Sequence, residues 1–457
     1  TSKALGLRSE ASQRFERGVD TILNHNALNR AIYLLEEIGA GKAVHGVAEC
    51  YPVPEKPVEI KAAPTKLAAR IGCDIDAATM KAILENLDFT VEEKGEDSWV
   101  VTVPTWRKDC DCSADLSEEV ARMYGYDKIE SKTPELIMAR GGQAPIEDVK
   151  DMIRDTLTGI GLDEVMTYSF YNAQVFDNLG LPADDSRRKA LQIINPISDD
   201  FRTIRTTLTP CLLSTVAYNQ ARQSERTAIF EVGRVFIPKT LPLTDFPEEK
   251  MVLAIAMSGK RNPLSWNTAK DAIDFYDIKG ALEEVMDSLQ VKGLSYGPTK
   301  EVFLHPGKSC AISYEGKVIG FMGAIHPTVQ DRFGLSAETY VLEVEIAPFV
   351  KSAEQIPQFE HVPQFPSVSR DIAVVVKAGV SASDLEAEIR KEGGALLVDV
   401  RIFDVYTGKQ VKSGYKSVAF NLTFQDVSRT LQDKDVDDVI KQIVANVQDK
   451  FGGMLRD

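Results

Sequence analysis

Cysteine and histidine are scarce in this sequence of 457 residues, which contains six cysteines and five histidines. The only close cysteine pair is Cys110 and Cys112, and no second Cys or His pair lies nearby to complete a zinc site. Scattered free thiols in a long chain are typical of a reducing compartment rather than of a secreted domain held together by disulfides. We therefore expect a cytoplasmic protein without structural zinc.

Long apolar runs are also lacking. The apolar segment 251–257 is far shorter than the roughly 18 to 20 residues that cross a bilayer, so no membrane-spanning helix is expected. The opening residues lack the charged-then-apolar layout of a signal peptide. The first residue is Thr1 instead of Met, which leads us to expect a fragment of a longer protein.

Positive charge is in deficit, with 53 Lys and Arg against 68 Asp and Glu, a net charge of −15. Such a balance excludes a chain that grips nucleic acid over its whole surface but allows local basic patches. The GxSxG elbow, the HExxH helix and the Walker-type loop are absent, and the histidines are too dispersed to indicate a general base. No catalytic residue is predicted.

The length predicts about three domains, and the 44% hydrophobic and 26% charged composition is typical of globular protein. In the first part, residues 1–52, a helix is expected over 22–38, as the tail of a domain whose beginning is absent. In the second part, residues 57–133, we expect a winged-helix-like unit whose elements are helices beginning near Pro64 and Asp76, strands at 89–92 and 99–103, and a helix over 115–124.

The sequence of the remaining chain predicts two further α+β domains. Over residues 146–350 an antiparallel sheet flanked by helices is favoured, with strands at 164–170, 190–194, 227–236, 251–258 and 340–346 and helices near 149–160, 209–222 and 275–289. Over residues 361–457 the order β-α-β-β-α, with room for one more strand, predicts a ferredoxin-like module, from strands at 371–376, 396–406 and 416–424 and helices at 383–390 and 435–451.

The sharpest local feature is a group of four acids, Asp109, Asp115, Glu118 and Glu119. Positions i, i+3 and i+4 share a helix face, and four oxygen ligands suit Mg²⁺. The alternative is that the acids complement the positive end of a helix dipole and pair with Arg107, Lys108 or Arg122. Spacing alone favours this second interpretation.

The C-terminal module is the least acidic large part of the chain, with 13 basic and 14 acidic residues over 361–457. Basic and aromatic side chains alternate in it, which is compatible with phosphate contacts and base stacking on a sheet face. A solvated charged face explains the same composition.

Four segments, in order, resemble the C-terminal part of the bacterial-type phenylalanyl-tRNA synthetase β subunit. Segment 8–20 resembles the end of its B3/B4 editing domain, and Val103–Asp109 with Asp115–Asp127 resembles its B5 domain. Segments 195–200, 218–223 and 229–233, with Arg205, resemble its catalytic-like core. Segments 365–372 and 428–431 resemble its ferredoxin-like anticodon-binding domain.

The resemblance implies four domains: a B3/B4 tail over 1–52, B5 over 57–133, a class II synthetase-like core over 146–350 and the anticodon-binding domain over 361–457. It also implies that an α subunit attaches phenylalanine to tRNA(Phe) with ATP, in an α2β2 assembly, while β supplies structure and tRNA contacts. Phe201-Arg202 is followed by Thr203-Ile204, so the class Phe-Arg-x-Glu element is missing and a catalytically silent core is expected.

The resemblance assigns roles to individual residues. Asp109, Asp115, Glu118 and Glu119 match the family's Asp-x5-Asp-x2-Glu-Glu pattern, a Mg²⁺ site at the interface with the α subunit. Ser9 and Ala11 align with residues that line the editing pocket, of which this chain would carry only a remnant. The implied candidates for tRNA contact are Lys416, Ser428 and Arg429.

Two other functions stay open at this point. A stand-alone nucleic-acid-binding protein is motivated by the winged-helix-like unit and the near-neutral C-terminal module. A Mg²⁺-dependent hydrolase built on the four acids is disfavoured, because no activating base or phosphate cradle accompanies them.

Overall fold

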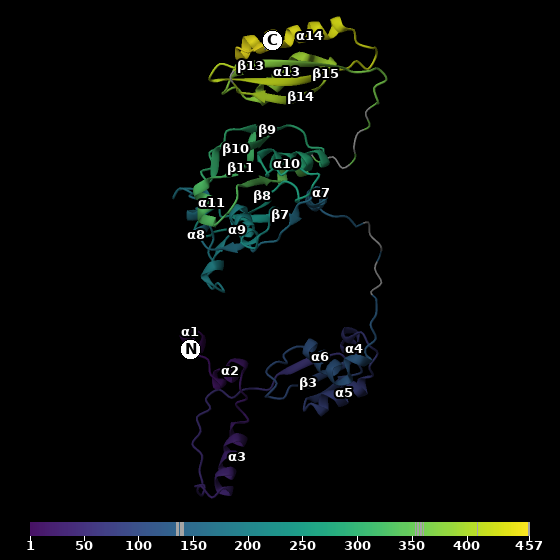
Figure 1. Cartoon of the computed structure of the whole chain (residues 1–457). Helices are drawn as coiled ribbons and strands as arrows, with labels where there is room; N and C mark the ends of the chain where they lie inside the picture. The colour runs from purple at the N-terminus through teal and green to yellow at the C-terminus, as the bar shows by residue number, and fades with distance from the viewer. Residues whose placement is uncertain are drawn as a thin grey trace. The chain divides into compact units, whose positions relative to one another are not determined.

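The computed structural model describes residues 1–133, 137, 141–351, 353, 356, 359, 361–408 and 410–455. Contacts divide the chain into two units, residues 1–140 and 141–457 (Figure 1). No helix within the described ranges combines the length and the apolarity needed to cross a bilayer.

The first unit begins with three helices that bury none of their side chains: α1 (Ser2–Leu5), α2 (Glu10–Arg17) and α3 (Asn24–Glu37). The carboxylate of Asp20 ties this segment to the rest of the unit, because it accepts hydrogen bonds from Thr105 Oγ1 at 2.7 Å and from the Ile22 amide at 2.8 Å. The predicted helix over 22–38 is present as α3.

The rest of the first unit is a small α+β fold with a three-stranded antiparallel sheet in the order β1-β3-β2. Its elements are β1 (Glu59–Ala62), α4 (Pro64–Ile71), α5 (Ala77–Asn86), β2 (Thr90–Gly95), β3 (Ser98–Thr102), α6 (Ser113–Tyr124) and the short η1 (Tyr126–Lys128). Asp76 caps α5 as predicted, since its Oδ1 accepts the Thr79 amide at 2.8 Å. The four-residue strand β1 was not predicted from the sequence.

The second unit begins with a seven-stranded sheet in the order β4-β7-β8-β12-β11-β10-β9, antiparallel except for the short β4–β7 pair. Its strands are β4 (Asp163–Glu164), β7 (Arg226–Ile237), β8 (Glu248–Gly259), β9 (Leu294–Gly297), β10 (Leu304–Tyr314), β11 (Lys317–Ile325) and β12 (Thr339–Glu345). A separate pair is formed by β5 (Phe170–Tyr171) and β6 (Thr203–Ile204).

Helices cover both faces of this sheet. One face packs against α7 (Pro145–Gly159), α10 (Phe275–Ser288) and α12 (Ala347–Val350). The other packs against α8 (Gln174–Asn178), α9 (Thr209–Gln220) and α11 (Pro327–Phe333), with the short turns η2 (Ser186–Arg188) and η3 (Asp199–Phe201) in the connecting loops. The predicted antiparallel sheet flanked by helices is therefore observed.

Two strands predicted in this region are wrong. Segment 164–170 is mostly loop between β4 and β5, and segment 190–194 contributes only an isolated bridge from Gln192 to Thr203. Part of their apolar content packs on the core, because Val165 and Ala190 contact the buried cluster beside α9 from loops. Met166, Tyr168 and Ile194 in the same segments are exposed.

The C-terminal module has the predicted ferredoxin-like order. It consists of β13 (Val368–Lys377), α13 (Ala382–Gly393), η4 (Gly394–Leu396), β14 (Leu397–Tyr406), β15 (Tyr415–Phe424), α14 (Asp433–Phe451) and β16 (Met454–Leu455), with strand order β14-β15-β13-β16. Both helices pack on one sheet face against Val374, Val418 and Phe420 (Figure 1). The additional strand allowed by the sequence is β16.

Two buried carboxylates lie on one face of the large sheet. Glu231 in β7 and Glu343 in β12 each pair with Ala254 of β8. Glu231 is 4% exposed and Glu343 is 8% exposed. Arg205 Nη1 donates to Glu231 Oε1 at 2.7 Å. Glu343 Oε2 accepts from Thr207 Oγ1 at 2.7 Å and from three further donors of residues 208 and 209. The chain's own segment 205–209 therefore occupies the centre of this face.

Gly233 adds a steric condition to this arrangement. A Cβ at this position would lie 2.6 Å from Arg205 Nη2 and 2.9 Å from Glu231 Oε1. Both of those groups are fixed in a buried ion pair, so neither can move aside. Glycine is required here because of the space that the ion pair occupies.

We expect Arg205→Ala to lower the free energy of unfolding by about 3–5 kcal/mol, because it leaves Glu231 buried without its cation. The measurement is urea unfolding of the full chain. Arg234→Ala is the matched control, because its ion pair with Glu249 is exposed and should cost less than about 1 kcal/mol. Equal losses in the two variants would contradict the assigned role of Arg205.

Candidate functional site

The predicted acidic site lies at the start of α6. The chain reaches the helix in extended backbone at Cys112, and Asp115 occupies the third helical position. Asp115 Oδ2 accepts the amides of Asp111 and Cys112, each at 2.9 Å. These two bonds lower the pKa of Asp115 below its usual range. Asp115 therefore acts as a cap that fixes the approach of the loop to the helix.

Arg107 connects two of the other acids. Its Nε and Nη2 donate to the two oxygens of Asp109 at 2.9 and 2.7 Å. Its Nη1 and Nη2 donate to the two oxygens of Glu119 at 2.9 and 2.8 Å. Glu119 also accepts from Arg122 Nη2 at 2.7 Å. The guanidinium thus holds the 107–110 loop onto α6 through two bidentate contacts.

The pKa values follow from this geometry. The hydrogen bonds from Arg107 lower the pKa of Glu119 to about 2, and they also hold the pKa of Asp109 below its usual range. Burial raises the pKa of the Cys110 thiol to about 11. The two acids are therefore ionised at neutral pH, whereas Cys110 carries its proton and is a poor nucleophile.

The four acids do not converge on one point within the described residues. Potential ligands lie within 4.8 Å of one another in two separate groups, Asp109 with Cys110 and Glu119, and Asp111 with Cys112 and Asp115. Glu118 belongs to neither group and is exposed. Oxygens bound to one Mg²⁺ lie at most about 4.2 Å apart, twice the Mg–O distance. In this arrangement the four acids do not fit a single Mg²⁺ ion.

The candidate editing residues lie at the start of α2. Ser9 caps the helix, since its Oγ accepts the Ser12 amide at 3.1 Å and its amide donates to Ser12 Oγ at 2.8 Å. Ala11 is exposed in the first turn of the same helix. The hydroxyl of Ser9 is thus engaged in a local structural bond.

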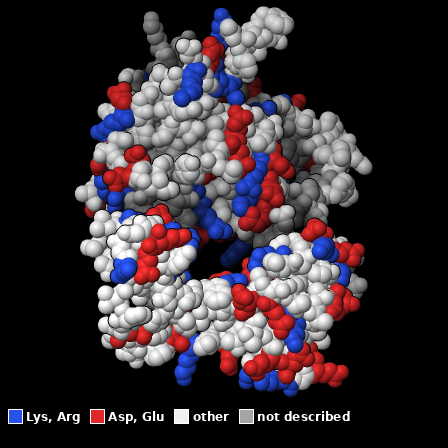
Figure 2. Space-filling model, turned by 90° about the horizontal axis from the view of Figure 1, so that it is seen from below, with Lys and Arg blue, Asp and Glu red and all other residues white. Residues whose placement is uncertain are grey.

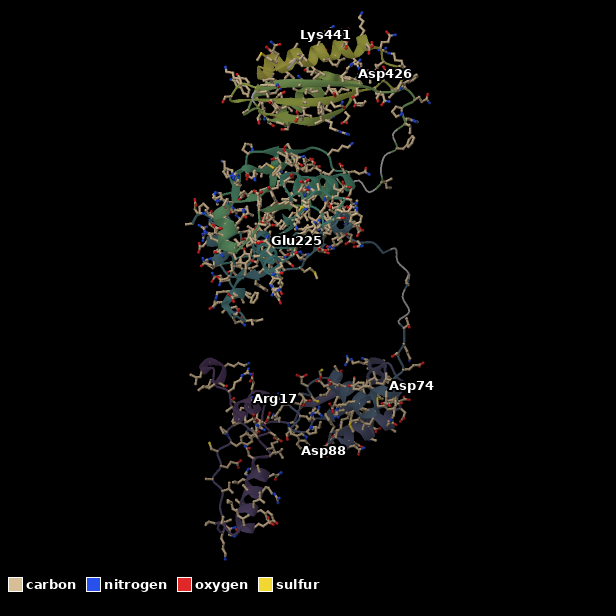
Figure 3. The ribbon with its side chains drawn as sticks, viewed as in Figure 1. Arg17, Asp74, Asp88, Glu225, Asp426 and Lys441 are labelled. Atoms are coloured by element: carbon tan, nitrogen blue, oxygen red, sulfur yellow. The ribbon has the colours of Figure 1, made fainter. Side chains whose placement is uncertain are left out.

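The three candidates for RNA contact lie in different settings. Ser428 donates from its amide and its hydroxyl to Asp426 Oδ1 at 2.8 and 2.7 Å. Arg429 Nη1 donates to Asp435 Oδ2 at 2.7 Å, in the first turn of α14. Both residues order the loop that leads into α14, and Figure 3 labels Asp426 in that loop. Lys416 is half-buried near the start of β15.

The sequence suggested a sheet face for RNA contact in this module but did not indicate which residues form the face opposite α13 and α14. Small and polar side chains lie on it, among them Ala373, Ala419 and Asn421, because they alternate with residues of the buried helix-covered face. Asn421 Nδ2 donates to Asp371 Oδ1 at 2.6 Å, and Arg401 stands opposite Asn421 on β14. Two-residue alternation in three strands was the signal that could have revealed this face.

Charge is mixed rather than segregated. On the face of the molecule seen in Figure 2, acidic and basic side chains alternate without one continuous field of either sign. A nucleic-acid contact on such a surface has to be local.

Family models match the chain in four consecutive segments. They are the B3/4 domain over residues 1–40, the tRNA synthetase B5 domain over 60–126, the phenylalanyl tRNA synthetase beta chain CLM domain over 129–346 and the ferredoxin-fold anticodon binding domain over 363–456. The chain belongs to the phenylalanyl-tRNA synthetase β-subunit family. It corresponds to the C-terminal part of that family's members.

Relatives in this β-subunit family match over the whole chain. It is 35% identical to the phenylalanine–tRNA ligase beta subunit of Clostridium acetobutylicum, 37% to that of Moorella thermoacetica and 38% to that of Vibrio cholerae. In each case the match covers all of this chain and 56% of the relative. The chain thus spans about half the length of these β subunits.

The Arg107–Glu119 pair of this β-subunit family member predicts a pH dependence. A carboxyl whose pKa is lower in the folded state stabilises the fold above about pH 4.5, and this contribution disappears as the pH falls toward 2. We expect the stability advantage of the native chain over Glu119→Gln to be at most about 3 kcal/mol at pH 7 and to shrink by about 1.4 kcal/mol by pH 3.5.

The measurement is urea unfolding in EDTA, followed by fluorescence of the buried Trp99 after Trp106 and Trp266, the other two tryptophans, are changed to Phe. Glu118→Gln, an exposed acid on the same helical turn, is the control and should give curves parallel to the native chain. A pH-independent difference for Glu119→Gln would contradict the assignment.

Proposed function

We propose that this chain is the tRNA-binding and assembly part of a phenylalanyl-tRNA synthetase β subunit, and that it does not itself catalyse aminoacylation. In this proposal an α subunit uses ATP to attach phenylalanine to tRNA(Phe), in a cytoplasmic α2β2 assembly. The observation that carries the proposal is the run of four family matches in one order along the chain.

The interior of the large sheet supports a non-catalytic role. We take this sheet to be a class II synthetase-like core whose centre lacks room for a substrate, because Arg205, Thr207 and Thr209 bind Glu231 and Glu343 there. Arg202, in the remnant Phe-Arg sequence, is exposed and pairs with Asp199. No catalytic residue is assigned to this chain.

The first unit is proposed to be an assembly domain. Three helices around a three-stranded sheet support the winged-helix-like description of residues 57–133, which include the B5 match. A Mg²⁺ ion on Asp109, Asp115, Glu118 and Glu119 stays a prediction of the family resemblance for the assembled enzyme, since the four acids do not fit one ion in this chain. Ser9 and Ala11 are proposed to be a remnant of the editing pocket.

The C-terminal module is proposed to contact the tRNA. The match to an anticodon-binding domain supports this, together with the uncovered sheet face that carries Arg401 and Asn421. Of the three candidates, Lys416 is the most compatible with a phosphate contact. The side chains of Ser428 and Arg429 already bind Asp426 and Asp435.

We expect the purified chain to show no phenylalanine-dependent exchange between ATP and pyrophosphate. Exchange should appear only when a bacterial phenylalanyl-tRNA synthetase α subunit is added, and light-scattering chromatography should show a complex of the two chains. Robust exchange by the chain alone would refute the proposed division of labour.

We expect Lys416→Ala to weaken binding of tRNA(Phe) several-fold and to reduce the slope of log affinity against log salt by roughly 0.7–0.9, the effect of one lost phosphate contact. Fluorescence anisotropy with labelled tRNA measures both quantities. Lys441→Ala is the control, because this lysine lies exposed on α14 (Figure 3) and pairs with Asp438.

The same titration tests the second candidate function. Nanomolar binding to duplex DNA, independent of an α subunit and with a steep salt slope, would favour a stand-alone nucleic-acid-binding protein. An unchanged tRNA affinity and slope in Lys416→Ala would remove this lysine from the interface.

A further inference from the structure

The acidic cluster at α6 contains a carboxylate that cannot remain unpaired. Glu119 is 6% exposed and packs beside the apolar core residues Leu116 and Val120. A buried carboxylate without a cation costs several kcal/mol. Something positive must therefore lie against Glu119 whether or not a metal ion is present.

Arg107 already supplies that charge. All three of its nitrogens donate, Nε to Asp109, Nη1 to Glu119 and Nη2 to both acids, at distances of 2.7 to 2.9 Å. Nη2 also lies 3.2 Å from Cys110 Sγ. A planar guanidinium matches two carboxylates through fixed paired bonds, which a spherical ion does not.

The position of Arg107 is fixed from several sides. Its side chain is 21% exposed, and the guanidinium carbon lies 5.8 Å from the centre of the Phe89 ring. Both oxygens of Asp109 and both oxygens of Glu119 are engaged by it. A divalent cation that bound both acids would lie beside the positive guanidinium and would compete with it for oxygens that it already engages.

We infer that Arg107 is the resident cation of this cluster, and that it keeps divalent cations off Asp109 and Glu119 in the chain by itself. The inference differs from the Mg²⁺ site that the family resemblance implies, and it does not depend on the proposed function. Arg107 is thus a positioning residue that joins the loop 107–110 to α6.

The test is Mn²⁺ binding to the full chain, measured by electron paramagnetic resonance of the free ion. We expect the native chain to show no site that depends on Asp109 or Glu119. Arg107→Gln should gain about tenfold or more in Mn²⁺ affinity, because Asp109 then lacks a cation and Glu119 keeps only Arg122, and adding Asp109→Asn should abolish the gain. Arg122→Gln is the control and should not gain, since it leaves Arg107 in place.

Two results would overturn the inference. One is a Mn²⁺ site in the native chain that Asp109→Asn or Glu119→Gln abolishes. The other is a folded Arg107→Gln chain, as judged by circular dichroism, that binds Mn²⁺ no more tightly than the native chain.

A second measurement uses the native chain and does not require Arg107→Gln to fold. The Nε–H resonance of Arg107, assigned by its loss in Arg107→Lys, should keep its position as MgCl₂ is raised to about 10 mM, well above the concentration that fills a weak carboxylate site. Movement of that resonance in a saturable manner would show that Mg²⁺ displaces the guanidinium and would overturn the inference.

Discussion

A carboxylate that is buried in a protein needs a cation or a set of hydrogen-bond donors, and the chain must supply them from its own residues. In the large sheet Glu231 is neutralised by Arg205, and Glu343 is satisfied by hydroxyls and amides of residues 207–209. In the first unit Glu119 is neutralised by Arg107. Each of these bonds ties a loop to a sheet or helix, so the requirement for charge balance also fixes loop position.

This requirement explains why the centre of one face of the large sheet is polar but leaves no open space for a ligand. Its centre is polar, as in a substrate site, but the donors that face Glu231 and Glu343 come from segment 205–209 of the same chain. A ligand would have to break buried bonds to enter. The chain's own residues therefore occupy the centre of this face.

Much of the fold could be predicted from local sequence signals. Asp76 marked the start of α5 because its side chain caps the helix, and apolar segments of strand length marked β7, β12, β13 and β15. Short strands such as β1 and β9 escaped because a few residues give no measurable alternation. The longer β10 and β11 were also not predicted. Segments 164–170 and 190–194 were assigned wrongly because they have the apolar content of strands, although only some of their apolar residues pack on the core.

The acidic site shows what the spacing of residues along the sequence cannot predict. Neighbouring residues on a helix point about 100° apart, and in this chain Glu118 and Glu119 take different directions. The stripe of Leu116 and Val120 turns Glu119 inward and leaves Glu118 in solvent. The apolar stripe could have indicated which acid is buried. Arg107 was among the partners expected for the acids, but its two paired contacts depend on a loop conformation that sequence patterns do not specify.

Gly233 limits the substitutions that this chain can accept during evolution. Its missing Cβ leaves space that Arg205 and Glu231 fill, so the three positions share one volume and one charge balance. Replacing any one of them alone leaves either an uncompensated charge or a steric overlap. The three residues should therefore be inherited as a set, and lineages that lose the ion pair should be those in which position 233 is free to carry a side chain.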